Sequence, residues 1–170
     1  YSKDKSRIMP QELKQHIDEM IPAVEREMKA VLRAGEGADN ALYGMMHYHM
    51  GWTDEQFQPA LAPAGKRIRP LLLLLSAAAA GGEWEQALPA AAAVELLHNF
   101  TLIHDDIQDA SPTRRGRATV WTLWGAPQAI NAGDAMFALA HDALYRLADR
   151  EVPAGVTVQP RAALTRRVSP

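Results

Sequence analysis

Three aspartates stand close together at the end of a predicted helix, in the segment HDDIQD at 104–109. On a helical wheel of about 100° per residue, Asp105, Asp106 and Asp109 share one arc of about 100°. Carboxylates this close repel each other unless water or a cation lies between them. Oxygen ligands without cysteine suit Mg²⁺, which takes further ligands from substrate phosphates. The spacing therefore predicts a magnesium site, with a solvated acidic helix end as the alternative.

A basic loop follows the aspartates within a few residues. It contains Arg114, Arg115 and Arg117, with Gly116 as a flexible position between the last two. Arginine is suited to bidentate contacts with phosphate oxygens, so the loop is a candidate for binding a ligand whose phosphates a metal bridges. An internal salt-bridge cluster between these arginines and the aspartates is the alternative.

A second basic cluster, Lys66, Arg67 and Arg69, stands immediately before Pro70. Pro70 is expected to open a helix, since proline fits the first helical turn. Backbone N–H groups at a helix start favour anions, so the cluster predicts a second anion site. A solvated run of charge ahead of a helix is the alternative. The two basic clusters and the acidic cluster together predict two phosphate-bearing substrates and Mg²⁺.

The elements that position these residues are predicted to be helices in one all-α domain. The 170 residues fit a single compact domain, and apolar residues recur at three- and four-residue spacing. The first helix begins at Pro10, with Pro22 expected to kink or split it and Gly35 and Gly37 expected to end it. Further helices are predicted at 40–50, 71–80, 89–109 and 127–150. No strand alternation is visible, and from about residue 151 the pattern fades.

The composition excludes several classes of protein. Eighteen Lys and Arg against 20 Asp and Glu give a net charge of −2, too balanced for a protein whose main partner is nucleic acid. The absence of cysteine excludes disulfide frameworks and thiolate zinc sites, and makes the cytoplasm the expected compartment. The longest apolar run, 71–80, is too short for a bilayer span, and no targeting segment is expected.

Several of these segments, in this order and spacing, resemble the trans-isoprenyl diphosphate synthases, which make geranyl, farnesyl and geranylgeranyl diphosphate. The matching segments are GKRIRP at 65–70, ELLHNFTLIHDDIQD at 95–109, RRG at 114–116, WG at 124–125 and GD at 133–134. The resemblance covers about residues 40–148. It implies antiparallel helices around a central cavity and, usually, a homodimer.

The resemblance also implies the chemistry of the acidic motif. Asp105, Asp106 and Asp109 match the motif that binds Mg²⁺ bridging an allylic diphosphate, and Arg114 matches an arginine that holds that diphosphate. The implied allylic substrate is dimethylallyl, geranyl or farnesyl diphosphate. Its ionisation is assisted by Mg²⁺ and arginine at the departing diphosphate. The alkene of isopentenyl diphosphate then attacks the carbocation, and a proton is lost.

Isopentenyl diphosphate is the second substrate that the resemblance implies. The family positions that hold its diphosphate are matched here by Lys66, Arg69, His98 and Arg115. A lone histidine on a helix is more often a surface or core residue. His98 nevertheless lies two turns before Asp105 on the same face of the predicted helix, which favours the family role.

Product length is a further implication of the resemblance. In the family, bulky residues just before the first aspartate motif limit the growing prenyl chain. Phe100 stands five residues before Asp105 and Thr101 four before. This pair resembles archaeal-type geranylgeranyl diphosphate synthases and implies a twenty-carbon product, with the fifteen-carbon product as the alternative. The helical wheel, however, places Phe100 with Leu96 and Ile103 on the apolar stripe, away from the aspartates.

The sequence also departs from the family. Members are about twice this length and carry a second aspartate-rich motif, whereas no such motif follows Asp109 here. We therefore expect an N-terminal portion of a synthase that is inactive by itself. A non-catalytic regulatory subunit is an alternative that the intact aspartate motif disfavours. A terpene cyclase is another, disfavoured because a cyclase has no second diphosphate to hold.

Overall fold

The computed structural model describes residues 11–33 and 40–149. The α-helices of these residues are α1 (Gln11–Val31), α2 (Ala41–Met50), α3 (Ile68–Ala79), α4 (Leu88–Gln108), α5 (Val120–Trp124) and α6 (Ala126–Tyr145). Two short 3-10 helices, η1 (Trp84–Ala87) and η2 (Arg146–Asp149), precede α4 and follow α6. A hairpin of two-residue strands, β1 (Thr113–Arg114) and β2 (Arg117–Ala118), joins α4 to α5.

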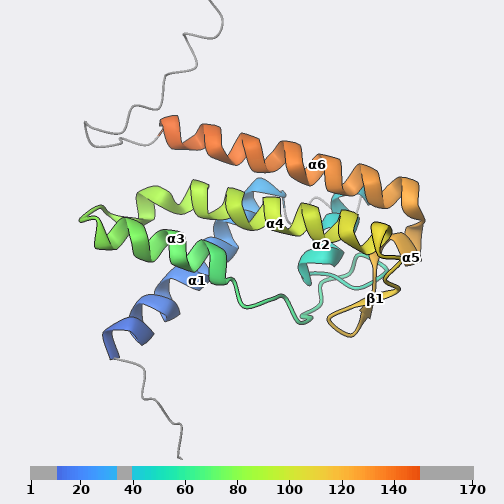
Figure 1. Ribbon diagram of the computed structural model, residues 1–170, viewed down its shortest axis with the longest axis horizontal. Helices are drawn as coiled ribbons and strands as arrows, with labels where there is room; N and C mark the ends of the chain where they lie inside the picture. Colours follow the sequence, from blue (N-terminus) through green and yellow to red (C-terminus); the bar gives the residue numbers. More distant parts are fainter. Residues whose placement is uncertain (1–10, 34–39, 150–170) are drawn as a thin grey trace, which may run out of the picture.

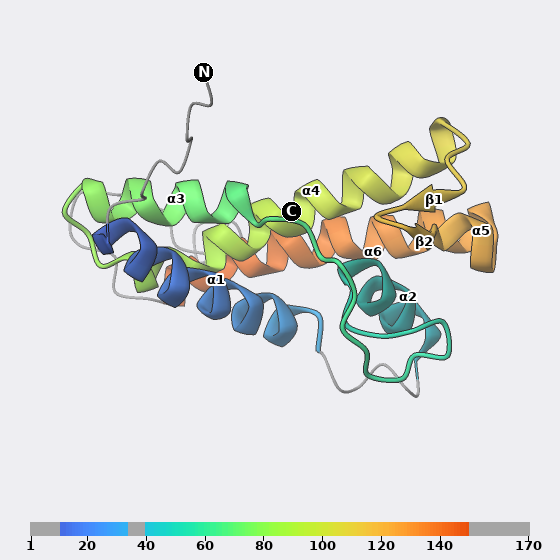
Figure 2. The same cartoon turned by 90° about the horizontal axis from the view of Figure 1, so that it is seen from below.

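Helix α4 is the central element. Figure 1 shows α3, α4 and α6 side by side. Helix α4 runs antiparallel to α3, and α6 runs antiparallel to α4. Helix α1 packs across α3 and α4, while α2 and the hairpin lie near the C-terminal end of α4 (Figure 2). This arrangement places the loop before α3, the middle of α4 and the hairpin close to one another, and these segments carry the candidate site.

Methionines and alanines dominate the core. Helix α1 buries Met20, Val24 and Met28, which repeat at helical spacing. Alanines on α4 and α6, among them Ala92 and Ala132, are fully buried, and these small side chains let the two helices approach closely. The resulting core spans α1, α2, α4 and α6 and holds the polar face of α4 in a fixed orientation.

Helix ends follow the capping residues. The side chain of Asn40 accepts a hydrogen bond from the backbone N–H of Leu42 (3.0 Å) at the start of α2. Gly51, with φ of +82°, ends that helix, since a left-handed residue suits glycine. Pro70 lies in the first turn of α3, and Pro89 in the first turn of α4.

The helices predicted from the sequence are confirmed, with three corrections. Pro22 does not split the first helix, which runs through it as one element from residue 11 to 31. The hairpin and the short helix α5 were not expected. Helix α6 ends at Tyr145 and gives way to η2, short of the predicted end at residue 150. Gly35, Gly37 and the tail from 151 lie outside the described residues.

The described helices include none that is long and apolar enough to cross a membrane. The apolar run at 71–80 falls mostly within one of these helices. That segment is α3, and it packs against α4 and α1.

Candidate active site

A cavity of about 220 Å³ lies between the start of α3, the middle of α4 and the turn of the hairpin. It is lined by Gly65, Lys66, Arg67, Ile68, Arg69, Glu95, His98 and Arg115. All four residues that the resemblance assigns to isopentenyl diphosphate therefore line one cavity, although they come from three separate segments. We call this cavity the anion pocket, because its lining carries four cationic side chains and one carboxylate.

Arg115 reaches into the anion pocket from the tight turn of the hairpin. Its φ of +54° is left-handed, so the residue turns sharply between the two strands. Burial, and then the charge of Arg67, lowers the pKa of Arg115. Its Nη1 atom is buried and has no hydrogen-bond partner among the described residues. A desolvated guanidinium with a free donor at a cavity is arranged to receive an anion.

Gly65 makes room for that guanidinium. A Cβ atom at residue 65 would lie 3.1 Å from Nη2 of Arg115, and the backbone φ of Gly65 is +44°. Both the left-handed backbone and the close approach favour glycine here. The loop before α3 can therefore lie directly against the arginine of the hairpin.

His98 lies on the wall that α4 contributes. Burial lowers the pKa of His98, the charges of Arg69 and Arg115 lower it further, and Glu95 opposes them. The imidazole is consequently neutral at pH 7, with one N–H donor and one acceptor nitrogen. It contributes a hydrogen-bond donor to the pocket rather than a further positive charge.

The second residue of the predicted basic cluster, Arg67, behaves differently from its neighbours. It is only 3% exposed, and its guanidinium is bound by Glu25 (Nε to Oε1, 2.6 Å) and Glu95 (Nη1 to Oε1, 2.9 Å). The interpretation of 66–69 as a solvated run of charge is therefore wrong for Arg67. Lys66 and Arg69, on either side of it, are exposed.

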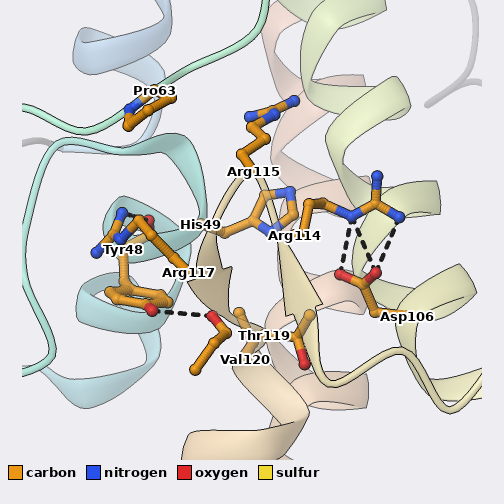
Figure 3. A pocket seen from close by; sticks show the side chains of 10 residues that line it. Tyr48, His49, Pro63, Asp106, Arg114, Arg115, Arg117, Thr119 and Val120 are labelled. Carbon is orange, nitrogen blue, oxygen red and sulfur yellow. Dashed lines mark hydrogen bonds and ion pairs between the residues drawn. The ribbon is translucent and has the colours of Figure 1, made fainter.

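The three aspartates at the end of α4 do not share one environment. Asp106 is 2% exposed, and Arg114 donates to both of its carboxylate oxygens (Nε to Oδ1, 2.9 Å; Nε to Oδ2, 3.0 Å; Nη2 to Oδ1, 2.8 Å), as Figure 3 shows. Asp105 and Asp109 are exposed. The internal salt bridge that the sequence left as an alternative thus forms between Asp106 and Arg114.

The carboxylates nevertheless fit the chemistry of Mg²⁺. In the described residues, no group of three or more histidine, aspartate or glutamate side chains is close enough to enclose a metal. Mg²⁺ is commonly held by one or two carboxylates, waters and substrate phosphates. Asp105 in the last turn of α4 and Asp109 at its C-cap are both exposed and would supply two such oxygen ligands. Asp106, occupied by Arg114, is less available than its neighbours.

A small cavity of about 20 Å³ adjoins this ion pair, between α2 and the hairpin. His49 lies in its wall and points between Arg114 and Arg115 (Figure 3). Burial, followed by the charges of Arg115 and Arg114, lowers the pKa of His49 to about 3, against a smaller opposing effect of Asn99. Sequence reasoning gave His49 no role, because a histidine on the inward side of a helix has the signal of an ordinary core residue.

Arg117 fixes the hairpin to α2. Its guanidinium carbon lies 3.8 Å from the centre of the Tyr48 ring, and its Nη atoms donate to the backbone oxygens of Tyr48 (3.1 Å) and Thr53 (2.8 Å). The hydroxyl of Tyr48 in turn donates to the backbone oxygen of Ala118 (2.8 Å). Arg117 therefore fixes the hairpin to α2, although it also lines the small cavity together with Arg114 and Arg115.

The residues predicted to limit product length face different surroundings. The ring of Phe100 lies against Phe137 of α6 (centroids 5.1 Å apart) and His104 (4.8 Å). Thr101 is exposed, and its hydroxyl donates to the backbone oxygen of His98 (2.8 Å). Phe100 therefore lies between α4 and α6, as the helical wheel indicated.

The fold and the site together define a protein of the isoprenoid synthase class. The sequence profile of the polyprenyl synthetase family matches residues 50–162, about two thirds of the chain, so the chain belongs to the polyprenyl synthetase family.

Farnesyl and geranylgeranyl diphosphate synthases are similar to part of the chain. The chain is 50% identical over 100 residues to a (2E,6E)-farnesyl diphosphate synthase of Mycobacterium bovis, covering 59% of this chain and 28% of that protein. It is 58% identical over 80 residues to a geranylgeranyl diphosphate synthase of Saccharolobus solfataricus, covering 47% of this chain and 24% of that protein. The chain thus spans about a quarter of the length of the curated relatives it matches.

Solved structures show the same fold. A polyprenyl synthetase from Streptomyces coelicolor superposes with a TM-score of 0.72 at 38% identity, covering 79% of this chain and 39% of that one. A geranylgeranyl pyrophosphate synthetase from Pyrococcus horikoshii superposes with a TM-score of 0.67 at 35% identity, covering 84% of this chain and 39% of that one. The helical arrangement of the described residues is that of prenyl-elongating enzymes.

Proposed function

We propose that the protein acts in Mg²⁺-dependent prenyl elongation, condensing isopentenyl diphosphate with an allylic diphosphate. The observation that carries this proposal is the convergence of Lys66, Arg69, His98 and Arg115 on one cavity, with a desolvated guanidinium facing it. A diphosphate would neutralise Lys66, Arg69 and Arg115 and would accept hydrogen bonds from all four side chains. The farnesyl and geranylgeranyl diphosphate synthases that the chain resembles support isopentenyl diphosphate as the ligand.

The allylic diphosphate is assigned to the C-terminal end of α4. Asp105 and Asp109 would hold Mg²⁺ there, and the metal supplies a Lewis acid that stabilises the charge of the departing diphosphate. Arg114, held by the neighbouring Asp106, would add positive charge near the same aspartates. Ionisation breaks the allylic carbon–oxygen bond, and the electron pair leaves with the diphosphate. A carbon–carbon bond to isopentenyl diphosphate then forms, and a proton is lost.

These 170 residues by themselves are proposed to bind substrate without elongating it. They contain one aspartate-rich motif, whereas the resemblance implies two for the complete reaction. A homodimer belongs to the same proposal, on the same resemblance, and a cytoplasmic location belongs to it because the sequence contains no cysteine.

Binding and turnover of labelled isopentenyl diphosphate test this proposal separately. The 170-residue protein should bind isopentenyl diphosphate, and Arg69→Met should abolish the binding. Arg26→Met, on the exposed side of α1, is the matched control and should bind normally. Absence of binding by the unsubstituted protein would contradict the function. Turnover of geranyl diphosphate at about 1 s⁻¹ or faster, an ordinary enzyme rate, would contradict the inactivity of these residues alone.

Product length is proposed to depend on Phe100 and Thr101, with geranylgeranyl diphosphate as the product and farnesyl diphosphate as the alternative. Phe100 fills the space between α4 and α6 beside Phe137. In a form of the protein that elongates, Phe100→Ala should lengthen the product and Thr101→Phe should shorten it. Identical products from both variants, by chromatography of the hydrolysed prenols, would show that neither side chain limits the chain.

A further inference from the structure

A carboxylate stands in the wall of the anion pocket, where it should oppose the binding of a diphosphate. Glu95 lines the cavity from α4 and is only 3% exposed. An uncompensated carboxylate at low exposure, next to a bound anion, would weaken binding through like-charge repulsion. A carboxylate at this position requires a neighbouring cation that neutralises its charge and does not itself bind the ligand.

Arg67 is placed to supply that cation. Its Nη1 donates to Oε1 of Glu95 (2.9 Å), and its Nε donates to Oε1 of Glu25 on α1 (2.6 Å). Glu25 is held in turn by the indole N–H of Trp52 (3.1 Å), and Oε1 of Glu95 accepts a further hydrogen bond from the side chain of Asn99 (3.3 Å). Two of the three guanidinium nitrogens are therefore committed to carboxylates.

The backbone of Arg67 explains how it differs from its neighbours. With φ of +51°, it caps the start of α3 in a left-handed conformation. Its side chain is buried while Lys66 and Arg69 stay exposed at the cavity. Since Arg67 joins α1 and α4 through the two glutamates, it also fixes the loop that carries both of these cations.

We propose, resting on the proposed function, that Arg67 is a positioning residue of the anion pocket. It neutralises the carboxylate of Glu95, and the diphosphate is bound by the other cations of the pocket. The charge of Arg67 lowers the pKa of Arg115 and the charge of Glu95 raises it, so the three charged groups interact with one another. The alternative is that Arg67 contacts the ligand directly. Its Nη2 atom is buried and has no hydrogen-bond partner in the part of the chain described, so it could make such a contact.

A double-mutant cycle with inorganic pyrophosphate distinguishes the two outcomes. Isothermal titration at fixed ionic strength compares the unsubstituted protein with Arg67→Met, Glu95→Gln and the double variant. Arg67→Met should weaken binding about 10-fold or more, because it leaves the carboxylate unneutralised. Glu95→Gln should bind within about 3-fold of the unsubstituted protein or more tightly, and the double variant should recover to within about 3-fold. Arg69→Met should stay weak when Glu95→Gln is added.

Each remaining result overturns a defined part of the reasoning. A double variant as weak as Arg67→Met would show that neutralising Glu95 is not how Arg67 supports binding, and would overturn the positioning role. Normal binding by Arg67→Met, with loss in Arg69→Met, would overturn that role and leave the proposed function intact. No pyrophosphate binding by the unsubstituted protein would overturn both. If Arg67→Met does not fold, Glu95→Gln is compared with the double variant, and a loss of about 10-fold between them contradicts the proposal.

Discussion

His49 is half-buried, with its Nε2 atom buried beside Arg114 and Arg115, and it predicts a specific loss of stability in acid. Its pKa is about 3 in the folded protein, against 6.5 when it is exposed to water. Between pH 6.5 and pH 3, His49 binds a proton in the unfolded chain but not in the folded protein. The free energy of unfolding is therefore unaffected by His49 above pH 6.5 and falls as the pH drops below 6.5. Each pH unit below 6.5 costs about 1.4 kcal/mol in the free energy of unfolding, down to about pH 3. At pH 5 the expected loss from this residue is about 2 kcal/mol.

Urea unfolding at pH 7.5 and pH 5.0 measures this loss. His49→Gln keeps a side-chain donor and acceptor but does not titrate. Between the two pH values, its free energy of unfolding should therefore fall by about 2 kcal/mol less than that of the unsubstituted protein. His16→Gln, on the exposed side of α1, controls for the removal of an imidazole. The same pH dependence in His49→Gln as in the unsubstituted protein would refute the burial of a neutral His49 beside the arginines.

Three further experiments test two close contacts and the metal ligands. Gly133→Ala would place a Cβ against the imidazole of His104, so it should lower the free energy of unfolding by about 1–3 kcal/mol. His104→Ala in the same chain should restore most of the loss. An unchanged urea midpoint for Gly133→Ala would refute this contact. Gly65→Ala should weaken pyrophosphate binding several-fold by displacing the neighbouring guanidinium, and normal affinity would show that the loop accommodates the methyl group. Asp105→Asn combined with Asp109→Asn should remove the enhancement of pyrophosphate binding by Mg²⁺ in calorimetry, whereas retained enhancement would place the metal elsewhere.

The sequence predicts the helices because proline, asparagine and glycine mark their ends. Pro89 and the apolar spacing after it locate α4, and Asn40 with Gly51 delimits α2. The hairpin escapes prediction because two-residue strands have no detectable period. The sequence identifies its residues only as a basic loop, which locates Arg114 and Arg115 but not the turn that places both at the small cavity and Arg115 also at the anion pocket.

The candidate site shows where spacing stops being informative. A helical wheel gives the direction of a side chain and not its partner, so it grouped Asp106 with Asp105, although an arginine from the hairpin pairs with Asp106 alone. Adjacent charges at 66–69 looked equivalent in the sequence. The left-handed backbone of Arg67, which no composition rule predicts for an arginine, separates it from the others.

A crystal structure of the protein with isopentenyl diphosphate and Mg²⁺ tests the central claim most directly. The account predicts diphosphate oxygens at hydrogen-bonding distance, about 3 Å, from Lys66, Arg69, His98 and Arg115, in the cavity between α3, α4 and the hairpin. A diphosphate bound elsewhere, with this cavity holding only solvent, would contradict it.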